Sequence, residues 1–295
     1  MQYYIGCSGW SYSAWQGPFY PSNMDNSSDW LKFYSSAFDY VEIDSSFYKT
    51  PNVFMVKNWF KRTPENFKFT AKFPKVITHD KRLKGVSKEL EHFFQSMLPL
   101  KDKTLALLIQ LPPSLKIIEG IQNLRELVPE LDNRFRYAIE VRDRSWFQDL
   151  AYNFFADNNI CLVWSQLAEL RTPPVVTTDF LYLRFIGDRT IHEEDFGRIQ
   201  KDRVMEMKTW ASKVKKVIKE EDKGRGTKNI NLAIVSANNH YAGFGPGTAN
   251  IFRKMVQLPE VIWEKEKQEG DNKSHLSGNL SQYHSKQRTM SDFMT

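Results

Sequence analysis

The sequence predicts a TIM-type (β/α)8 barrel, because strand-like and helix-like segments alternate along most of its 295 residues. Eight short apolar runs have the length and pattern of strands, and most are followed by a segment with helical spacing. A doubly wound open sheet is the alternative for such a rhythm. That fold usually shows one dominant glycine-rich turn after its first strand, and GCSG at residues 6–9 lacks the dinucleotide-binding spacing.

The expected elements follow one another in a regular order. Strands are predicted at residues 3–7, 40–45, 67–72, 104–110, 137–142, 161–165, 181–185 and 230–236. Apolar residues at helical spacing predict helices at 28–38, 53–61, 86–97, 117–131, 147–157, 203–220 and 248–256. The segment after the sixth strand is short and contains LRTPPVV. Because proline disfavours helix, we expect the sixth helix to be reduced or missing.

Composition divides the chain into two parts. Residues 1–260 carry the alternation and form the expected barrel, whereas residues 261–295 are polar, with few apolar residues until their end. A segment of this composition buries too little apolar surface to fold alone. We therefore expect a flexible C-terminal tail.

The bulk composition is that of an ordinary globular protein, with 41% hydrophobic, 14% aromatic and 26% charged residues. A formal net charge of +6 permits nucleic acid or phosphate partners without demonstrating them. Cys7 and Cys161 each adjoin an apolar run, so buried free thiols and a reducing, cytoplasmic location are expected. We see no signal peptide, and no apolar run approaches the roughly 20 residues that span a bilayer.

A pair of acids distinguishes the second strand. In FDYVEIDSSFYKTP, at residues 38–51, Val41 and Ile43 fall on one face of the strand, and Glu42 and Asp44 fall on the other. Unpaired charge is costly to bury, so both carboxylates must point to water, a cation or a ligand. The strand is thus expected to contribute either to a functional rim or to a network of ion pairs.

Polar side chains recur near the ends of most other expected strands. Active sites of these barrels lie at the carboxyl ends of the strands, so this recurrence predicts a ligand site at the mouth. For a single pair, such as Glu140 with Arg142, the alternative is a solvated ion pair. The residues expected to bind substrate are Trp10, Lys72, Gln110, Arg142, Trp164, Arg184, Asn238 and Asn239.

The chemistry of this set favours an anionic ligand. Arginine matches phosphate or carboxylate through two parallel hydrogen bonds, and lysine adds a point charge. Glu42 and Glu140 are the expected catalytic residues, acting as general acid or base if burial raises their pKa. A carboxylate pair across the mouth would also suit glycosidic hydrolysis, which requires a separation that chain spacing does not give.

Three other features leave alternatives open. His79, His192 and His240 lack HxH or HExxH spacing, so no cofactor is predicted, and a divalent metal has no support from spacing. The aromatic loop at residues 10–20 either stacks on a base or sugar ring or packs across the mouth as a lid. HYAGFGPGTAN at residues 240–250 either offers backbone N–H groups to a phosphate or only makes a turn.

Several segments together resemble those of one family, in the family's order. They are IGCSGWSYSAWQGPFYP, FDYVEIDSSFYKTP, NWFKRTPENFKFTAKFPKVITHDKRL, LLIQLPPS, AIEVRDRSWF, YLRFIGD and NNHYAGFGPGTAN. From about residue 4 to about residue 257, the chain is similar to the YecE-like proteins, called domain of unknown function 72. This resemblance implies a TIM-type barrel and carries no assigned activity.

The same resemblance marks motif positions without giving them roles. One departure is Ala237, where the family usually has an aromatic residue before the paired asparagines, and this departure changes the wall of the expected pocket. The matching positions are Glu42, Lys72, Gln110, Glu140, Arg142, Trp146, Arg184 and Asn238.

The end of the tail, QRTMSDFMT, resembles a motif that binds the sliding clamp (PCNA). Gln287, Met290, Phe293 and Met294 occupy the motif positions, within residues 287–294. On a short helical turn, the last three would share one face that plugs a groove. Met294 stands where a second aromatic is usual, and chance spacing is the alternative. The resemblance implies a clamp of archaeal or eukaryotic type and a DNA-related role.

The leading interpretation is a hydrolase or nuclease-like enzyme that acts on a phosphate-bearing or nucleic acid substrate and is recruited to the clamp. A non-catalytic module that binds nucleic acid or another anion, tethered to the clamp, is one alternative. A carbohydrate-active hydrolase is the other. No membrane association is expected.

Overall fold

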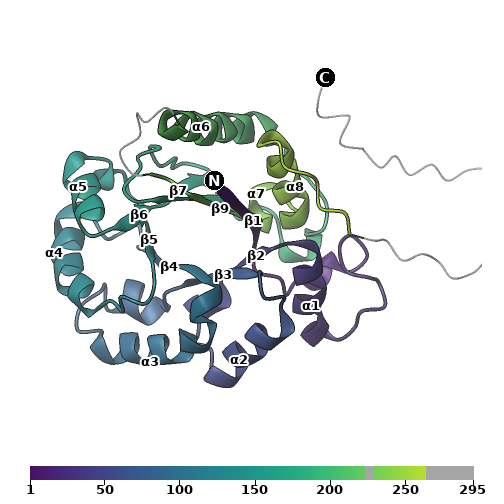
Figure 1. The fold of residues 1–295 in the computed structure, drawn as a ribbon, viewed down its shortest axis with the longest axis horizontal. Helices are drawn as coiled ribbons and strands as arrows, with labels where there is room; N and C mark the ends of the chain where they lie inside the picture. The colour runs from purple at the N-terminus through teal and green to yellow at the C-terminus, as the bar shows by residue number, and fades with distance from the viewer. Residues whose placement is uncertain (223–228, 264–295) are drawn as a thin grey trace, which may run out of the picture. The chain divides into compact units, whose positions relative to one another are not determined.

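The computed structural model describes residues 1–222 and 229–263. Within these residues, parallel strands form a barrel that is surrounded by helices (Figure 1). Residues 264–295, which include the clamp-like motif, lie outside the described part. The described strands are β1 (Gln2–Ser8), β2 (Tyr40–Ile43), β3 (Lys68–Lys72), β4 (Thr104–Gln110), β5 (Tyr137–Glu140), β6 (Ile160–Leu162), β7 (Trp164–Leu167), β8 (Phe180–Gly187) and β9 (Leu232–Ala237).

The strands have the order β6-β5-β4-β3-β2-β1-β9-β8-β7 in one sheet. β6 pairs with β5, β7 pairs with β8, and only Val163 separates β6 from β7 along the chain. The Val163 N–H donates to the Ile139 carbonyl at 2.9 Å. The single expected sixth strand is thus two short segments that join the two ends of the sheet, so the predicted barrel is nearly closed.

The helices follow the strands close to the predicted positions. The Pro-rich stretch at residues 168–179 contains no helix, as its composition predicts. The helices are α1 (Ser27–Ala37), α2 (Val53–Arg62), α3 (Ser87–Met97), α4 (Ile117–Leu127), α5 (Asp149–Asp157), α6 (Val204–Asp222), α7 (Asn239–Ala242) and α8 (Gly245–Met255). In the described ranges, no helix has both the length and the apolar character that crossing a bilayer requires.

The alternation of side chains along β2 sorts them between two cores. Val41 and Ile43 join the large cluster between the sheet and the helices. Tyr40 belongs to the smaller cluster that includes Tyr182, and Glu42 lies two residues further along the same face. Glu42 therefore points into the barrel, as the strand pattern predicts.

The two cysteines are free and buried, in agreement with the sequence-based expectation. Cys7 lies in the cluster beneath the helices, and Cys161 lies in the smaller cluster with Tyr182. Burial raises the pKa of both thiols far above their ordinary value. Neither thiol is therefore suited to act as a nucleophile.

Candidate functional site

A cavity of about 330 Å³ lies at the carboxyl ends of the strands. This is the end at which barrels of this type place their active sites. Its lining includes six of the residues predicted to bind substrate, brought together from the first, third, fourth, fifth, eighth and ninth strands or the loops that follow them. These six are Trp10, Lys72, Gln110, Arg142, Arg184 and Asn238.

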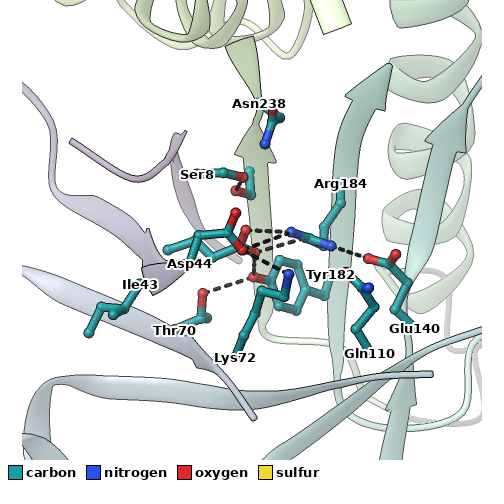
Figure 2. A network of polar contacts seen from close by, with 12 residues as sticks. Ser8, Ile43, Asp44, Thr70, Lys72, Gln110, Glu140, Tyr182, Arg184 and Asn238 are labelled. Carbon is teal, nitrogen blue, oxygen red and sulfur yellow. Dashed lines mark hydrogen bonds and ion pairs between the residues drawn. The ribbon is translucent and has the colours of Figure 1, made fainter. Parts of the chain in front are cut away.

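Arg184 on β8 is held by two buried carboxylates beneath the cavity. Its Nε and Nη2 donate to Oε2 and Oε1 of Glu42 at 2.8 and 2.6 Å. Its Nη1 donates to Oε2 of Glu140. Figure 2 shows the guanidinium of Arg184 between the side chains of Asp44 and Glu140. Glu42 and Glu140 are 0% exposed and Arg184 is 3% exposed, so this network is almost fully shielded from water.

A chain of hydroxyl groups supports Glu42 from below. The Tyr182 hydroxyl donates to Oε2 of Glu42. It lies 2.8 Å from Thr70 Oγ1 and 3.1 Å from the Tyr40 hydroxyl, which itself lies 2.7 Å from Thr70 Oγ1. Because the single Tyr182 proton is used on Glu42, Tyr182 can only accept from the other two groups, which supply two protons for the three contacts among these hydroxyls. The carboxylate of Glu42 is thereby fixed on two sides.

Arg142 links the buried network to the cavity wall. Its Nε donates to Oε1 of Glu140, and its Nη2 donates to Oε1 of Gln110 at 3.0 Å. Burial opposes the ionisation of Glu140, but the charges of Arg142 and Arg184 outweigh it, so the pKa of Glu140 is lowered. Glu140 is therefore an ionised counter-charge, and the predicted ion pair with Arg142 is present.

Lys72 and Asp44 form a second ion pair that faces the cavity directly. Lys72 Nζ lies 3.0 Å from Asp44 Oδ1 and 4.2 Å from the centroid of the Phe47 ring. The side chain of Asp44 is 28% exposed. Burial again opposes ionisation, but Lys72 and Arg184 dominate and lower the pKa of Asp44. Asp44 is thus an ionised carboxylate at the cavity surface.

The expected catalytic residues Glu42 and Glu140 do not line the cavity. Both oxygens of each carboxylate accept hydrogen bonds from buried neighbours, so neither group presents a free oxygen to a ligand. The condition that burial raises the pKa is not met at Glu140, because two arginines outweigh the effect of burial and lower the pKa. In this geometry both glutamates hold Arg184, and Glu140 also holds Arg142.

Trp164 and Asn239, also expected to bind substrate, lie away from the cavity. Trp164 is buried, stacks on Trp210 with ring centroids 5.9 Å apart, and donates from Nε1 to the Val175 carbonyl at 2.9 Å. The Asn239 Oδ1 accepts from Trp15 Nε1 at 3.1 Å and from the Gly245 N–H at 2.8 Å. Trp164 thus faces outward from the barrel, toward the helices. Asn239 stabilises the turn that leads to α8.

The aromatic loop and the glycine-rich turn both contribute more to the packing of the barrel than to an open binding surface. Trp15, Phe19 and Tyr20 of the aromatic loop are buried against α1, whereas Trp10 and Tyr12 line the cavity. In the glycine-rich turn, the N–H groups of residues 243, 245 and 248 already donate to protein oxygens, so they do not form a free anion nest. In the described part of the chain, no group of three or more His, Cys, Asp and Glu could hold a metal ion.

Further lining residues, most of them in the connections between strands and helices, were absent from the predicted set. Tyr48 follows the acids of FDYVEIDSSFYKTP, and Arg189 follows YLRFIGD, so proximity to these segments was the available signal. Loops have no periodicity from which the direction of a side chain can be read. The additional residues include Tyr12, Tyr48, Arg189, Glu193, Phe196 and His240.

Two bacterial relatives align with about half of this chain. The UPF0759 protein YecE of Escherichia coli strain K12 is 28% identical over 144 residues, which are 49% of this chain and 50% of YecE. The UPF0759 protein YunF of Bacillus subtilis is 32% identical over 156 residues, which are 50% of this chain and 54% of YunF. The alignments therefore span about half the length of these relatives.

Solved structures match over most of the chain. A DUF72 family protein of Thermotoga maritima has a TM-score of 0.68 and 27% identity, covering 87% of this chain and all of that protein. A DUF72 family protein of Enterococcus faecalis has a TM-score of 0.69 and 22% identity, covering 90% of this chain and 99% of that protein; this second likeness shows the fold alone.

The family model described as "Protein of unknown function DUF72" matches residues 4–271. This range contains the whole cavity lining and all the described strands and helices except the first two residues of β1. Together with the likeness to YecE and YunF, the match shows that the chain belongs to the DUF72 family, also called UPF0759.

Proposed function

We propose that the mouth of the barrel binds a phosphate-bearing anion and that Arg142, Lys72 and Arg189 are its main cationic contacts. The observation that carries the proposal is the buried network of Arg184 with Glu42 and Glu140. Replacing buried ion pairs by apolar side chains is often neutral or stabilising, so stability alone does not account for three buried charges. A fixed array of arginines at the edge of a cavity is suited to hold a phosphate.

The favoured reaction class is hydrolysis of a phosphoester. Asp44 replaces Glu42 and Glu140 in the acid–base role, because it is the carboxylate of the network that lines the cavity. Asp44 is ionised, so it would accept a proton from a water that attacks phosphorus. The bond from phosphorus to the ester oxygen breaks in the same displacement, and the departing alcohol takes its proton from solvent. Arg184 would stabilise the charge that develops on the phosphate, since its own orientation is fixed.

Binding is tested first with inorganic phosphate and nucleoside monophosphates, by calorimetry on the full chain. Arg142→Gln should weaken binding at least tenfold because it removes a charged donor from the cavity. Arg125→Gln is the matched control, since Arg125 is an exposed arginine on the outer helix α4. Equal affinity of the two variants would overturn the proposed site.

Turnover is tested separately with aryl phosphate mono- and diesters. Asp44→Asn should remove hydrolysis while phosphate still binds. Binding without hydrolysis by the unmodified chain would instead support the non-catalytic module. The carbohydrate alternative has no observation in its favour, because Glu42 and Glu140 are both occupied by arginine donors rather than open across the cavity.

Recruitment to a sliding clamp is a second proposal, and it rests on the sequence at residues 287–294 alone. The full chain and the variant Phe293→Ala are compared for retention of a PCNA-type clamp in a pull-down. Loss of binding in the variant supports the motif, because the aromatic side chain would fill the groove. Retention by both, or by neither, would remove the proposal.

A further inference from the structure

The walls of the cavity are unequal. Near β1, β8 and β9, its lining includes Tyr12, Glu193 and Phe196 from the loops that follow the strands. Near β3, β4 and β5, the lining residues among those the structure describes lie at the strand end or two residues beyond it, namely Lys72, Gln110 and Arg142. The loops that follow β3, β4 and β5 therefore contribute less to the cavity wall than the loops near β1, β8 and β9.

These loops, together with the loop that follows β2, are basic. The segments at residues 44–52, 73–86, 111–116 and 141–148, which follow β2 to β5, contain eight Lys and Arg and three Asp and Glu. We call these four segments the basic sector. The segments that follow β1, β7, β8 and β9 contain five Lys and Arg and eight Asp and Glu. The loops at the carboxyl end of the barrel are therefore polarised, with the excess of positive charge in those that follow β2 to β5.

Part of the positive charge in this sector has no local counter-charge. Within residues 1–222 and 229–263, no carboxylate forms an ion pair with Lys49, Lys84 or Arg144, and all three side chains are exposed. Lys75 and Lys116 are paired with Asp80 and Asp143. Three cations are thus available to an anionic ligand without breaking an ion pair of the described residues.

The longest loop of the sector is held in place. Arg82 donates from Nε and Nη2 to the two carboxylate oxygens of Glu119 at 2.8 and 2.7 Å, and from Nη1 to Ser114 Oγ at 2.9 Å. The Asn123 side chain donates to the Arg82 carbonyl at 2.8 Å. These bonds tie the loop after β3 to the loop after β4 and to α4. A surface fixed in this way binds without the cost of ordering its backbone.

An exposed aromatic side chain stands where the cavity meets the sector. Tyr48 is 75% exposed and lines the cavity. Its ring packs at its edge against Phe47, with centroids 5.3 Å apart, so it is supported while remaining open to solvent. Aromatic side chains beside a positive groove are the usual platform on which the bases of a single strand stack.

We infer that the ligand of the barrel mouth is a single-stranded nucleic acid, with one phosphate in the cavity, a base on Tyr48 and the flanking phosphates on the basic sector. This inference rests on the proposed function, namely phosphate binding by Arg142 and Lys72. A cavity of about 330 Å³ admits one unit of such a strand and excludes a duplex. An acidic peptide would match the charges but would leave Tyr48 without a flat partner.

The test is fluorescence anisotropy with a labelled 12-residue oligothymidylate and the full chain. The triple variant Lys49→Glu, Lys84→Glu, Arg144→Glu should bind at least tenfold more weakly at 0.1 M salt. The slope of log affinity against log salt should flatten by about 2, because each lost phosphate contact removes about 0.7. The matched control is Lys32→Glu, Arg125→Glu, Lys208→Glu, whose exposed side chains lie on α1, α4 and α6. It should bind like the unmodified chain.

The outcomes separate this inference from the proposal on which it rests. If inorganic phosphate binds and the oligonucleotide does not, the single-strand inference is overturned while the phosphate site stands. If neither binds, the proposed function fails as well. Equal weakening by both triple variants overturns the sector as the binding surface. Tyr48→Ala should weaken binding of the oligonucleotide several-fold and leave binding of inorganic phosphate unchanged. If polyglutamate binds more tightly than the oligonucleotide, the surface is assigned to an acidic protein instead.

Discussion

Two sets of ion pairs lie at the carboxyl end of the barrel and differ in their contact with water. Arg184, Glu42 and Glu140 are almost fully buried, whereas Lys75 and Asp80 are about half exposed, at 54% and 52% of their side chains. Both sets join a basic side chain to carboxylates. Water makes the difference, because burying a charge costs several kcal/mol and an exposed pair gains at most about 1 kcal/mol.

Burial separates the ion pairs that carry information about function from those that do not. An exposed pair can form wherever two side chains happen to meet, so Lys75 with Asp80 says little. A buried triad of charges persists only if all its members are present, since one lost partner leaves an uncompensated charge. The network around Arg184 is therefore the part of the mouth that tolerates least change.

The largest expected effect comes from removing one buried carboxylate. Glu42→Gln should lower the free energy of unfolding by about 3–5 kcal/mol, because Arg184 keeps its charge and loses its bidentate partner. Urea denaturation measures the change, with Asp80→Asn as the exposed counterpart. A loss below about 1 kcal/mol for Glu42→Gln would remove the distinction between the two sets.

A smaller effect is expected from the hydroxyl chain beneath Glu42. Tyr182→Phe deletes the donor to Glu42 and the acceptor for Thr70 and Tyr40, and unsatisfied buried groups cost about 1–3 kcal/mol. Tyr48→Phe, at an exposed ring, is the control and should leave stability unchanged. Equal urea midpoints for the two variants would show that the buried hydroxyl adds nothing.

The stabilisation that the buried set provides should also depend on pH in the acid range. The pKa of Glu140 is lowered from its ordinary value of 4.5, so its stabilisation is complete above pH 4.5 and is lost as the pH falls through the folded value. The difference in melting temperature between the unmodified chain and Glu140→Gln should therefore shrink from pH 6 to pH 3. A constant difference over that range would contradict an ionised Glu140.

The smallest expected effect is at the surface. Lys75→Ala should change the free energy of unfolding by no more than about 1 kcal/mol, because water screens its pair with Asp80. Added salt should reduce even this change. A loss comparable to that of Glu42→Gln would mean that exposure does not govern these pairs.

The fold was largely accessible from the sequence because strands and helices have periods. Val41 and Ile43 alternate with Glu42 and Asp44, and this alternation places the acids on the face opposite the helices, where Glu42 is found. The break at Val163 was not accessible, because one residue between β6 and β7 leaves no mark on the apolar pattern. Trp164 was consequently assigned to the cavity although it faces Trp210.

The members of the candidate site were easier to predict than their connections. Arg184 and Glu42 were both named, but they are 142 positions apart, and no local pattern reports that they share two hydrogen bonds. Tyr182 lies two residues before Arg184 on the same face of the strand, which was the available signal for its role. Whether a carboxylate is free or occupied depends on such distant partners, so roles were less predictable than positions.

The hydroxyl chain beneath Glu42 has one contact more than it has protons. The Tyr182 proton is used on Glu42, so the hydroxyl groups of Tyr40 and Thr70 supply two protons for the three contacts that remain. One of these three contacts therefore lacks a hydrogen bond at any moment, and the protons can be arranged in more than one way. The ring of Tyr40 would report exchange between such arrangements, readable by fluorine resonance from a fluorotyrosine at that position.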